Sequence, residues 1–559
     1  MKTLSININS LTTRNVVTMI CGIWLTYLLI LGVLQISGLP FGFMVWPMGE
    51  DLNWMRFIRD GHGIGMTHLF WQMNDRNPLS AWWWFIASPI VKNVDWGIYA
   101  VRKCVDPFLA IVTYMVLDRL GRQQCRTFAF STALIVLMWN FSNYYEQIMW
   151  EFLVALGFSL LSIFFYCRYV DNQRKVGHDL ALAMICYFVA FTTYTLQSGA
   201  IIVIACLAFF RSANSLSLLE RLKNTARDAS FFLALFVLYD CIWYTVNRNS
   251  AVYYTFDWSS FFSYFFVSAK QFIFHATYPG FLRSTWNDWS IWALCLMFAS
   301  AFIGFYFILF KLGKRMVGTG IKIPLGWVCV VLLAIALPTM ILEATNTTWG
   351  YGSRTPMAQQ VWQPIFYMSI LFFIANLIPY KNSAKLQKRV LFIVALFGAM
   401  ITTIALDYNY HLSERTHYQQ VLAKGLKALP IANNVAPHFI LKVTDMTNED
   451  LNTVTPWIPD YGPILLKNKN ISLHSLSRIN DLHLGSSPYL TIHFGSDEKG
   501  VINGANIGDS TPVPYKNIWI VFFDGKKVWV PSEVSEKDLE GFRITWERNN
   551  PINQTEKVG

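Results

Sequence analysis

The sequence predicts an all-α polytopic membrane protein of about 11 transmembrane helices, followed by a small C-terminal α+β soluble domain. Three observations predict this class. Of the 559 residues, 54% are hydrophobic and only 14% are charged, whereas a soluble globular protein carries roughly 25% charged residues. Apolar runs recur up to residue 406, and residues 407–559 have the composition of a water-soluble module. An ordinary cytosolic enzyme and a disordered chain are both excluded, because so much apolar surface could not stay solvated.

Eleven apolar segments are long enough, or nearly so, to cross the ~30 Å hydrocarbon core, which takes ~20 residues of helix. Two of them, 127–142 and 196–210, are short by that standard. The first segment is too long for a cleavable signal sequence, so we expect it to be retained as a span. The predicted spans are residues 16–38, 97–117, 127–142, 148–167, 179–194, 196–210, 229–246, 289–310, 323–343, 364–380 and 389–406.

The distribution of basic residues predicts the orientation of these spans. With a cytoplasmic N-terminus, the segments that face the cytoplasm hold 20 Lys and Arg, and the outer segments hold 10. Such an excess is typical of cytoplasmic loops, and it accounts for much of the net charge of +11 without a nucleic-acid partner. Eleven spans then place the C-terminal module on the outer side of the membrane.

Two further apolar stretches are expected to lie at the membrane surface and not to cross it. Residues 259–280 are long enough to span, but as a span they would turn the basic segment 311–322 outward, against the charge rule. Residues 81–93 are too short to span. The first outer loop, residues 39–96, holds seven tryptophans, most of which we expect in an aromatic belt at the headgroup level.

The C-terminal module is predicted to combine one helix with several strands. A polar helical stretch from His411 to Leu429 continues the last span into the aqueous phase, and Pro430 ends it. Strand-like runs follow at 438–443, 489–494 and 518–531, the last as a hairpin that turns at Asp524-Gly525. Because the module has no recognisable nucleophile motif or phosphate loop, we expect it to support acceptor binding or the integrity of the scaffold.

The strongest cluster of reactive side chains lies in the first outer loop. Glu50 and Asp51 follow the first span closely, and Arg56 and Arg59 stand one to two helical turns later. The segment Asp75-Arg76-Asn77-Pro78-Leu79 brings further charge before the second span. A carboxylate at the membrane face can accept a proton from a substrate hydroxyl, and an arginine can hold a phosphate through bidentate bonds. The plainer alternative is a solvated loop with ordinary ion pairs.

At these residues the chain resembles the polytopic glycosyltransferases of the GT-C class, which use polyprenyl-phosphate sugars as donors. Within that class it is most similar to the serotype-converting O-antigen glucosyltransferases. Members carry an acidic pair early in the first outer loop, then a glycine, then an Arg-x-Pro-type motif; here these are Glu50-Asp51, Gly61 and Asp75-Arg76-Asn77-Pro78-Leu79. The resemblance covers the topology of roughly the first 400 residues through short motifs, and this chain has Glu-Asp where relatives often have Asp-Asp.

The resemblance implies a transmembrane glycosyltransferase domain at residues 1–406, with Asp51 or Glu50 as the catalytic base and Asp51 preferred. It implies a periplasmic domain at 407–559 and a place in the bacterial inner membrane.

Other polar residues on the same predicted side are candidates for substrate binding. Glu146 and Glu151 lie between the third and fourth spans or at the membrane edge, where charge is expensive; either acid could equally be a structural partner for a loop arginine. Arg354, the one basic residue of its loop, could bind a donor phosphate. Lys270 could do the same, although snorkelling from an interfacial helix explains it as well. The predicted substrate-binding residues are Arg56, Arg59, Asp75, Arg76, Glu146, Lys270 and Arg354.

The sequence specifies no metal site. His62 and His68 stand six residues apart, which is wrong for a pair of ligands on one helix, and we expect structural roles for both. Asp51 and Asp60 could ligate a divalent cation, but nothing requires one. No cofactor is therefore certain, and a divalent cation stays open.

Residues and resemblance together predict an inverting glycosyltransferase that moves a hexose, glucose by preference, from a polyprenyl-phosphate donor to a surface polysaccharide such as O-antigen. The expected partners are this donor, a lipid-linked or surface glycan acceptor and membrane lipid, without nucleic acid. Two alternatives stay open, an O-antigen polymerase that uses the same carriers and a lipid-linked glycan transporter or flippase. The lack of internal repeats and the scarcity of ionisable groups within the spans count against the transporter.

Overall fold

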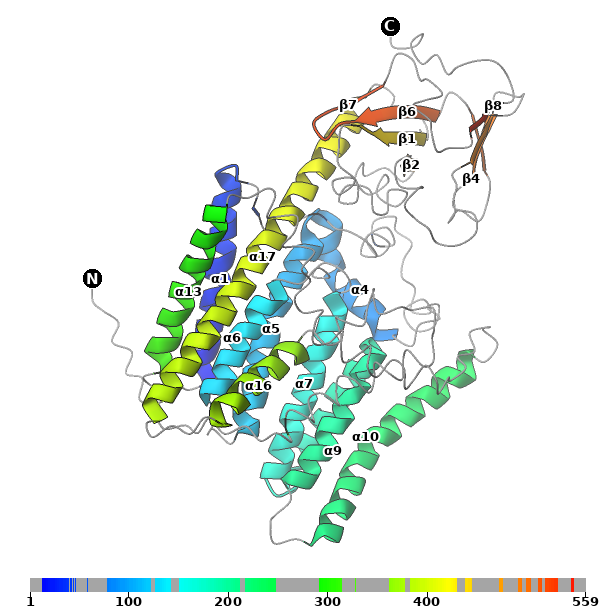
Figure 1. Cartoon of the computed structure of the whole chain (residues 1–559). Helices are drawn as coiled ribbons and strands as arrows, with labels where there is room; N and C mark the ends of the chain where they lie inside the picture. Colours follow the sequence, from blue (N-terminus) through cyan, green and yellow to red (C-terminus); the bar gives the residue numbers. More distant parts are fainter. Residues whose placement is uncertain are drawn as a thin grey trace. The chain divides into compact units, whose positions relative to one another are not determined.

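The computed structural model (Figure 1) describes only part of the chain, and every structural statement below refers to that part. The described residues are 13–39, 41–42, 44, 46, 58, 78–121, 126–141, 150–211, 217–247, 291–313, 327, 361–377, 383–429, 438–444, 472–475, 491–494, 499–503, 511–514, 518–530 and 544–546.

Most of the described residues are helical and many of the helices are apolar, which confirms the predicted helical membrane class in its broad form. Four helical stretches are long and apolar enough to cross a membrane: Thr13–Ile36, Trp150–Asp171, Leu218–Thr245 and Lys388–Ala428. The α-helices are α1 (Thr13–Ile36), α4 (Pro78–Asn93), α5 (Gly97–Leu120), α6 (Arg126–Phe141), α7 (Trp150–Asp171), α8 (Gly177–Thr193), α9 (Ala200–Phe210), α10 (Leu218–Asn247), α13 (Ile291–Gly313), α16 (Trp362–Leu377) and α17 (Ser383–Ala428).

Ten of the eleven predicted spans contain a described helix. The remaining span, 323–343, lies outside the described residues apart from Trp327, and so does the aromatic segment 259–280. The number of spans and their sidedness therefore stay predictions.

Helix α10 begins at Leu218, earlier than the predicted span at 229. Its start is fixed by a capping box, in which the Ser217 hydroxyl and backbone N–H both donate to the Glu220 carboxylate, at 2.9 and 2.8 Å. The Glu220 N–H bonds back to the Ser217 hydroxyl at 3.3 Å. These reciprocal bonds satisfy backbone donors that a helix start otherwise leaves unpaired, so the polar segment before the span is helical too.

The residues divide into two compact units. The first comprises 1–43, 64–87 and 100–410, and the second comprises 44–63, 88–99 and 411–559. The functional division at residue 406 stays a prediction.

Helix α7 forms the core of the first unit. Sixteen of its residues are buried, as expected of a helix that is apolar on every side and surrounded by other helices. Gly157 lies so close to the Phe108 ring of α5 that a β-carbon there would clash. The Ser162 hydroxyl donates to the Ala183 carbonyl of α8 at 2.8 Å. Helix α7 is thus packed directly against both α5 and α8.

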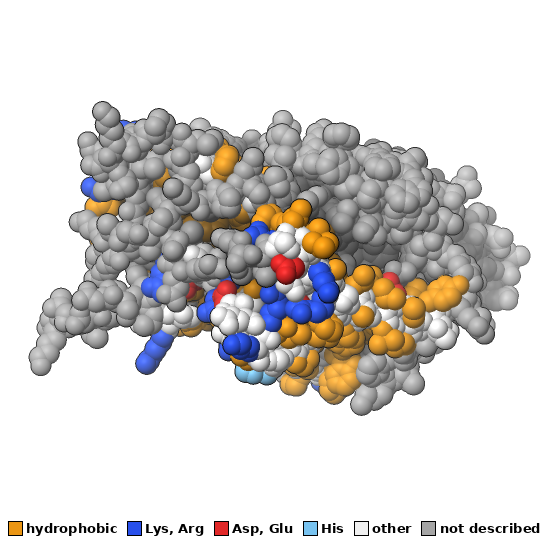
Figure 2. Space-filling view, turned by 90° about the horizontal axis from the view of Figure 1, so that it is seen from below, with side chains coloured by type: hydrophobic (Ala, Val, Ile, Leu, Met, Phe, Trp, Pro, Cys, Tyr) orange, Lys and Arg blue, Asp and Glu red, His pale blue; other side chains and the backbone are white. Residues whose placement is uncertain are grey.

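Ion pairs connect the helix ends at the side of this unit where α5, α7 and α9 finish. Arg211 donates to Asp171 at 2.7 Å and to the carbonyls of Arg119 and Leu120 at 2.6 and 2.7 Å. Arg119 pairs with Asp171 at 2.8 Å. Figure 2 views the molecule from below and shows Lys and Arg side chains gathered beside hydrophobic ones. The predicted excess of basic residues in these segments therefore forms an ordered network.

The second unit contains two four-stranded sheets. One has the order β2-β1-β6-β7, with β1 parallel to β2 and β6, and the other has the order β5-β4-β3-β8. The first sheet is made of β1 (His438–Val443), β2 (Ser472–Ser475), β6 (Ile518–Phe523) and β7 (Val528–Trp529), and the second of β3 (Thr491–Phe494), β4 (Lys499–Asn503), β5 (Thr511–Pro514) and β8 (Ile544–Trp546).

The predicted hairpin is present as β6 and β7, which pair antiparallel. Gly525 adopts a positive φ of 82° at the turn, a conformation that glycine reaches without steric cost. The Asp524 carboxylate accepts the N–H groups of Lys526 and Lys527, both at 2.9 Å. Desolvation raises the pKa of Asp524, but these donors outweigh it and hold the pKa below its ordinary value. The Asp-Gly pair in the sequence therefore located this turn correctly.

Candidate functional site

The nine side chains predicted to form the site all lie outside the described residues, so their arrangement stays a prediction. They are Glu50, Asp51, Arg56, Arg59, Asp75, Arg76, Glu146, Lys270 and Arg354. The structure does describe helix α1, which precedes the first outer loop, and helix α4, which lies at its end. The chain that carries the predicted acids and bases is attached to these two helices.

Helix α17 holds the beginning of the first outer loop. After α1 the chain turns at Gly38, where φ is +77°. Asn409 then makes two bonds to Gly42, accepting its N–H at 3.1 Å and donating to its carbonyl at 2.8 Å. Four residues later, the Trp46 N–H donates to the Thr416 hydroxyl at 3.1 Å. The backbone is thus fixed up to four residues before Glu50.

Replacing Asn409 should destabilise the protein. Asn409→Leu leaves the buried N–H and carbonyl of Gly42 without these partners, which typically costs about 1–3 kcal/mol. We expect a lower midpoint of thermal unfolding in detergent. Thr402→Val is the matched control on α17, because the Thr402 hydroxyl bonds only the Gly398 carbonyl of its own helix among the contacts described. Equal midpoints for the two variants would contradict this role of Asn409.

Helix α4 receives the chain at the end of the loop, directly after Asp75-Arg76-Asn77. Pro78 is its first residue, a position that suits proline because the missing N–H has no helical partner there. The Ser80 hydroxyl donates to the Glu151 carboxylate of α7 at 2.8 Å, and both side chains are buried. The Trp83 indole N–H donates to Thr193 of α8 at 3.0 Å. Glu151 is therefore bonded to a hydroxyl of α4, a contact that neither of its two interpretations predicted, and both interpretations stay untested.

Of the aromatic side chains of α4, some are packed in the core and others are exposed. Trp84 is fully buried and meets Trp150 of α7 edge to face, with ring centroids 5.9 Å apart. Phe85 and Ile86, the next two residues, are exposed. The aromatic belt was therefore the wrong interpretation for Trp84, which is a core residue. The helical form of 81–93 is observed, and its place at the membrane surface stays a prediction.

The start of α5 carries a buried group of charges that we did not single out from the sequence. Arg102 and Asp106 are fully buried, and Lys103 is nearly so. Arg102 donates to Asp106 one helical turn later, and the Lys103 ammonium lies 3.7 Å from the same carboxylate. Pro107 cannot donate the backbone bond that a regular helix would make to Lys103. We call Arg102, Lys103 and Asp106 the buried triad.

The buried triad places two basic side chains beside one carboxylate. Among the described residues, Nε and Nη2 of Arg102 have no hydrogen-bond partner. Burying guanidinium donors without partners is costly. The planar guanidinium group can donate two parallel hydrogen bonds to the oxygens of a phosphate or carboxylate. The buried triad can therefore accept an anion.

The buried triad lies close to the end of the first outer loop along the chain. Arg102 is five residues into α5, about 8 Å along the axis at the usual rise per residue. The turn from α4 is tight, since Gly97 lies so near the Ile90 carbonyl that a β-carbon would be crowded. The sequence already indicated a site here, because Arg102, Lys103 and Asp106 are three charges inside a predicted span. Charged residues within spans are rare and commonly have a function. Because these three charges lie inside a predicted span, the scarcity of ionisable groups within the spans counts less strongly against a transporter.

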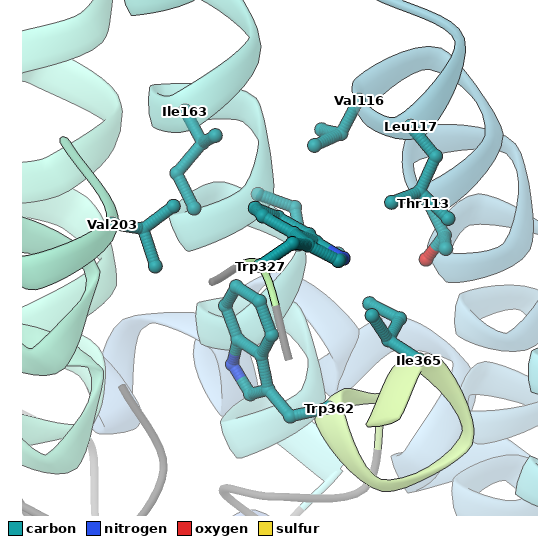
Figure 3. A pocket seen from close by; sticks show the side chains of 9 residues that line it. Thr113, Val116, Leu117, Ile163, Val203, Trp327, Trp362 and Ile365 are labelled. Atoms are coloured by element: carbon teal, nitrogen blue, oxygen red, sulfur yellow. The ribbon is translucent and has the colours of Figure 1, made fainter. Parts of the chain in front are cut away.

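An apolar pocket between α5, α7, α9 and α16 offers no comparable chemistry (Figure 3). Figure 3 shows the indoles of Trp327 and Trp362 close together at its centre. The lining residues are Thr113, Val116, Leu117, Leu160, Ile163, Val203, Trp327, Trp362 and Ile365. With one hydroxyl among these side chains, the pocket serves packing and not proton transfer. Within the described parts of the chain, no group of three or more His, Cys, Asp or Glu could hold a metal.

Comparison with known proteins gives a structural likeness without a family assignment. The chain is similar to crystal structures of ArnT from Cupriavidus metallidurans in the apo state and bound to undecaprenyl phosphate. For the apo structure the sequence identity is 12%, the TM-score is 0.36, and the match covers 83% of this chain and 86% of that chain. For the bound structure the sequence identity is 13%, the TM-score is 0.36, and the match covers 82% of this chain and 85% of that chain. No protein-family model and no curated protein matches the sequence.

Proposed function

We propose that this chain is an inverting membrane glycosyltransferase that takes a hexose, glucose by preference, from a polyprenyl-phosphate donor and adds it to a surface polysaccharide such as O-antigen. The buried triad is the observation that supports the proposal, because the buried Arg102 guanidinium has two donors without a partner among the described residues and suits the phosphate of a lipid-linked donor. Helix α4 lies at the end of the first outer loop, whose Glu50-Asp51 pair and Asp75-Arg76 segment suggested this chemistry, and Arg102 comes nine residues after α4 ends at Asn93.

The reaction is a single displacement at the anomeric carbon. The acceptor hydroxyl oxygen forms a bond to that carbon while the bond to the phosphate oxygen breaks, and the polyprenyl phosphate leaves with the electron pair. Asp51 takes the proton of the hydroxyl, and the configuration at the carbon inverts. Phosphate is a fair leaving group, so positioning and charge stabilisation should supply most of the rate. Arg76 before α4 and Arg102 in α5 are the cations that we assign to the phosphate.

The proposal is tested by supplying a radiolabelled polyprenyl-phosphate hexose and a lipid-linked glycan to the full-length protein in proteoliposomes. We expect label in the glycan and no change in the number of its repeats. Longer glycans without label transfer would identify a polymerase. Movement of lipid-linked glycan across the membrane without either product would identify a flippase.

The orientation that this reaction needs leads to a second test. The excess of basic residues predicts a cytoplasmic N-terminus and an outer C-terminal module. A reporter that is active only in the cytoplasm should therefore be silent when fused after Gly559 and active when fused at the N-terminus. An active C-terminal fusion would contradict the predicted eleven spans and indicate that residues 259–280 also cross.

A further inference from the structure

A second cluster of charges lies at the opposite end of α5 from the buried triad. Arg119 is 17 residues after Arg102, about 26 Å further along the helix axis. Here five arginines, each from a different helix, helix end or turn of the first unit, converge on three aspartates. We call Arg119, Arg168, Arg174, Arg211 and Arg227 the arginine face.

Two of the three aspartates beneath the arginine face are each shared between two arginines. Asp171 binds Arg119 and Arg211 at 2.8 and 2.7 Å. Asp228 of α10 accepts Arg174 at 2.9 Å, Arg227 at 3.0 Å and the Tyr166 hydroxyl of α7 at 2.9 Å. Asp179 of α8 lies 3.4 Å from Arg168. Five arginines over three aspartates leave an excess of two positive charges.

Two of the three acids lie beneath more exposed bases, whereas Asp171 is 20% exposed and its partner Arg211 only 7%. Asp179 and Asp228 are fully buried, whereas the side chains of Arg168 and Arg227 are 38% and 51% exposed. Figure 2 views this end of the first unit and shows the Lys and Arg side chains on its surface. Buried acids cannot approach an external anion as closely as the exposed guanidiniums do. The outward potential of the arginine face is therefore positive.

The arginine face is also held in place before any ligand arrives. Gln173 and Arg174, in the turn between α7 and α8, both have φ near +60°, a region that non-glycine residues seldom occupy. The bond from Arg174 to Asp228 holds that turn against α10. A cation network fixed by such contacts loses little conformational freedom on binding.

Apolar side chains flank the arginine face on α10. Leu218, Leu219 and Leu222 are exposed by 65%, 76% and 51% in the same first turns that carry Arg221 and Lys223. Exposed leucines next to cations at the end of a candidate span are typical of a segment at the boundary between headgroups and acyl chains. A free phosphate or a nucleic acid offers nothing for these leucines to contact.

We propose that the arginine face binds the phosphate headgroups of anionic phospholipids, with the exposed leucines of α10 against the acyl chains. Basic clusters at the membrane surface attract anionic lipid in this way, at roughly 1 kcal/mol for each charge. The site is independent of the glycosyl transfer proposed above, because it lies at the other end of α5. Binding of this kind would hold the α7–α10 bundle at a fixed depth in the leaflet.

The test measures lipid binding to the full-length protein in detergent, by native mass spectrometry and by the midpoint of thermal unfolding. The probes are phosphatidylglycerol, phosphatidylcholine with the same acyl chains, and inorganic phosphate. We expect phosphatidylglycerol to bind and stabilise the protein in preference to the other two. Arg227→Gln should weaken its binding about fivefold, and Arg168→Gln with Arg227→Gln about 25-fold.

The substitutions leave the inner network intact. Asp228 keeps Arg174 and Tyr166, and Asp179 keeps the Asn172 amide at 3.3 Å. If the double variant fails to fold, Arg227→Gln alone decides, with Arg227→Lys as the variant that retains the charge and should retain binding. The matched control for net charge is Lys92→Gln with Lys427→Gln, two exposed lysines that are not members of the arginine face.

Three results would overturn the proposal. Equal binding of phosphatidylcholine would remove the role of headgroup charge. Equal stabilisation by inorganic phosphate would show a site for free anions and not for lipid. An equal loss in the Lys92→Gln and Lys427→Gln control would show an effect of net charge alone.

Discussion

Asp51→Asn should leave a folded, membrane-inserted protein that binds its donor and transfers sugar roughly 10²–10⁴-fold more slowly. The change removes the proton acceptor at nearly constant shape, and general base catalysis is worth about that factor. The measurement is glycan modification in cells at matched protein level, with donor binding measured separately on the purified protein.

The described backbone contacts nearest to Asp51 along the chain are those of Gly42 and Trp46. The backbone is held at Gly42 by Asn409 and at Trp46 by Thr416, so Asp51 lies five residues beyond a fixed point. If the next residues are helical, Arg56 and Arg59 share a face at i, i+3. They could then keep the carboxylate ionised or receive the donor phosphate beside it.

Glu50→Gln is the matched control for Asp51→Asn, because the two acids are adjacent and point differently on a helix or a strand. We expect a milder effect from Glu50→Gln. Normal modification by Asp51→Asn with loss in Glu50→Gln would make Glu50 the base. Full activity in both variants would contradict a catalytic site in the first outer loop.

The parts of the fold that local sequence determines could be predicted. Long apolar runs indicated α7 and α17, and the Asp524-Gly525 pair indicated the hairpin of β6 and β7, because each depends on residues close together in the chain. Helix α17 even continues through the polar stretch after its apolar half, as predicted, and ends at Ala428 before Pro430.

The partners of individual side chains could not be predicted in the same way. Ser80 and Glu151 are 71 residues apart, and Gly42 and Asn409 are 367 apart. Hydrophobic periodicity identifies the buried face of a helix but not the residue that meets it. The parallel pairing of β1 with β6 depends likewise on tertiary contacts, and the four strands β2, β4, β5 and β8 were not anticipated.

The buried triad shows a different failure, since its residues were visible in the sequence. Residues 97–117 were predicted as a span from their apolar content, and Arg102 and Lys103 were counted only as basic residues of an outer segment. The burial of all three charges is what distinguishes a candidate anion site from a solvated helix end.

Replacing the whole buried triad by apolar residues should preserve the fold and abolish transfer. Removing one member alone leaves an unpaired buried charge, which typically costs 3–5 kcal/mol, whereas well-packed apolar residues in place of all members are often neutral or stabilising. The variant is Arg102→Met, Lys103→Met and Asp106→Leu. If these charges were merely structural, the variant would be as active as the wild type.

If Arg102 and Lys103 hold the donor phosphate, the apolar variant should lose donor affinity and roughly 10²–10³-fold in transfer rate, as expected when groups that stabilise developing charge are removed. The matched control is Arg126→Met with Asp118→Leu, a partly buried pair 3.3 Å apart that joins the start of α6 to the last turn of α5. Transfer should persist in this control. A stable triad variant with normal transfer would show that the charges only pack the helix, whereas loss of donor binding with an unchanged unfolding midpoint would assign them to the phosphate.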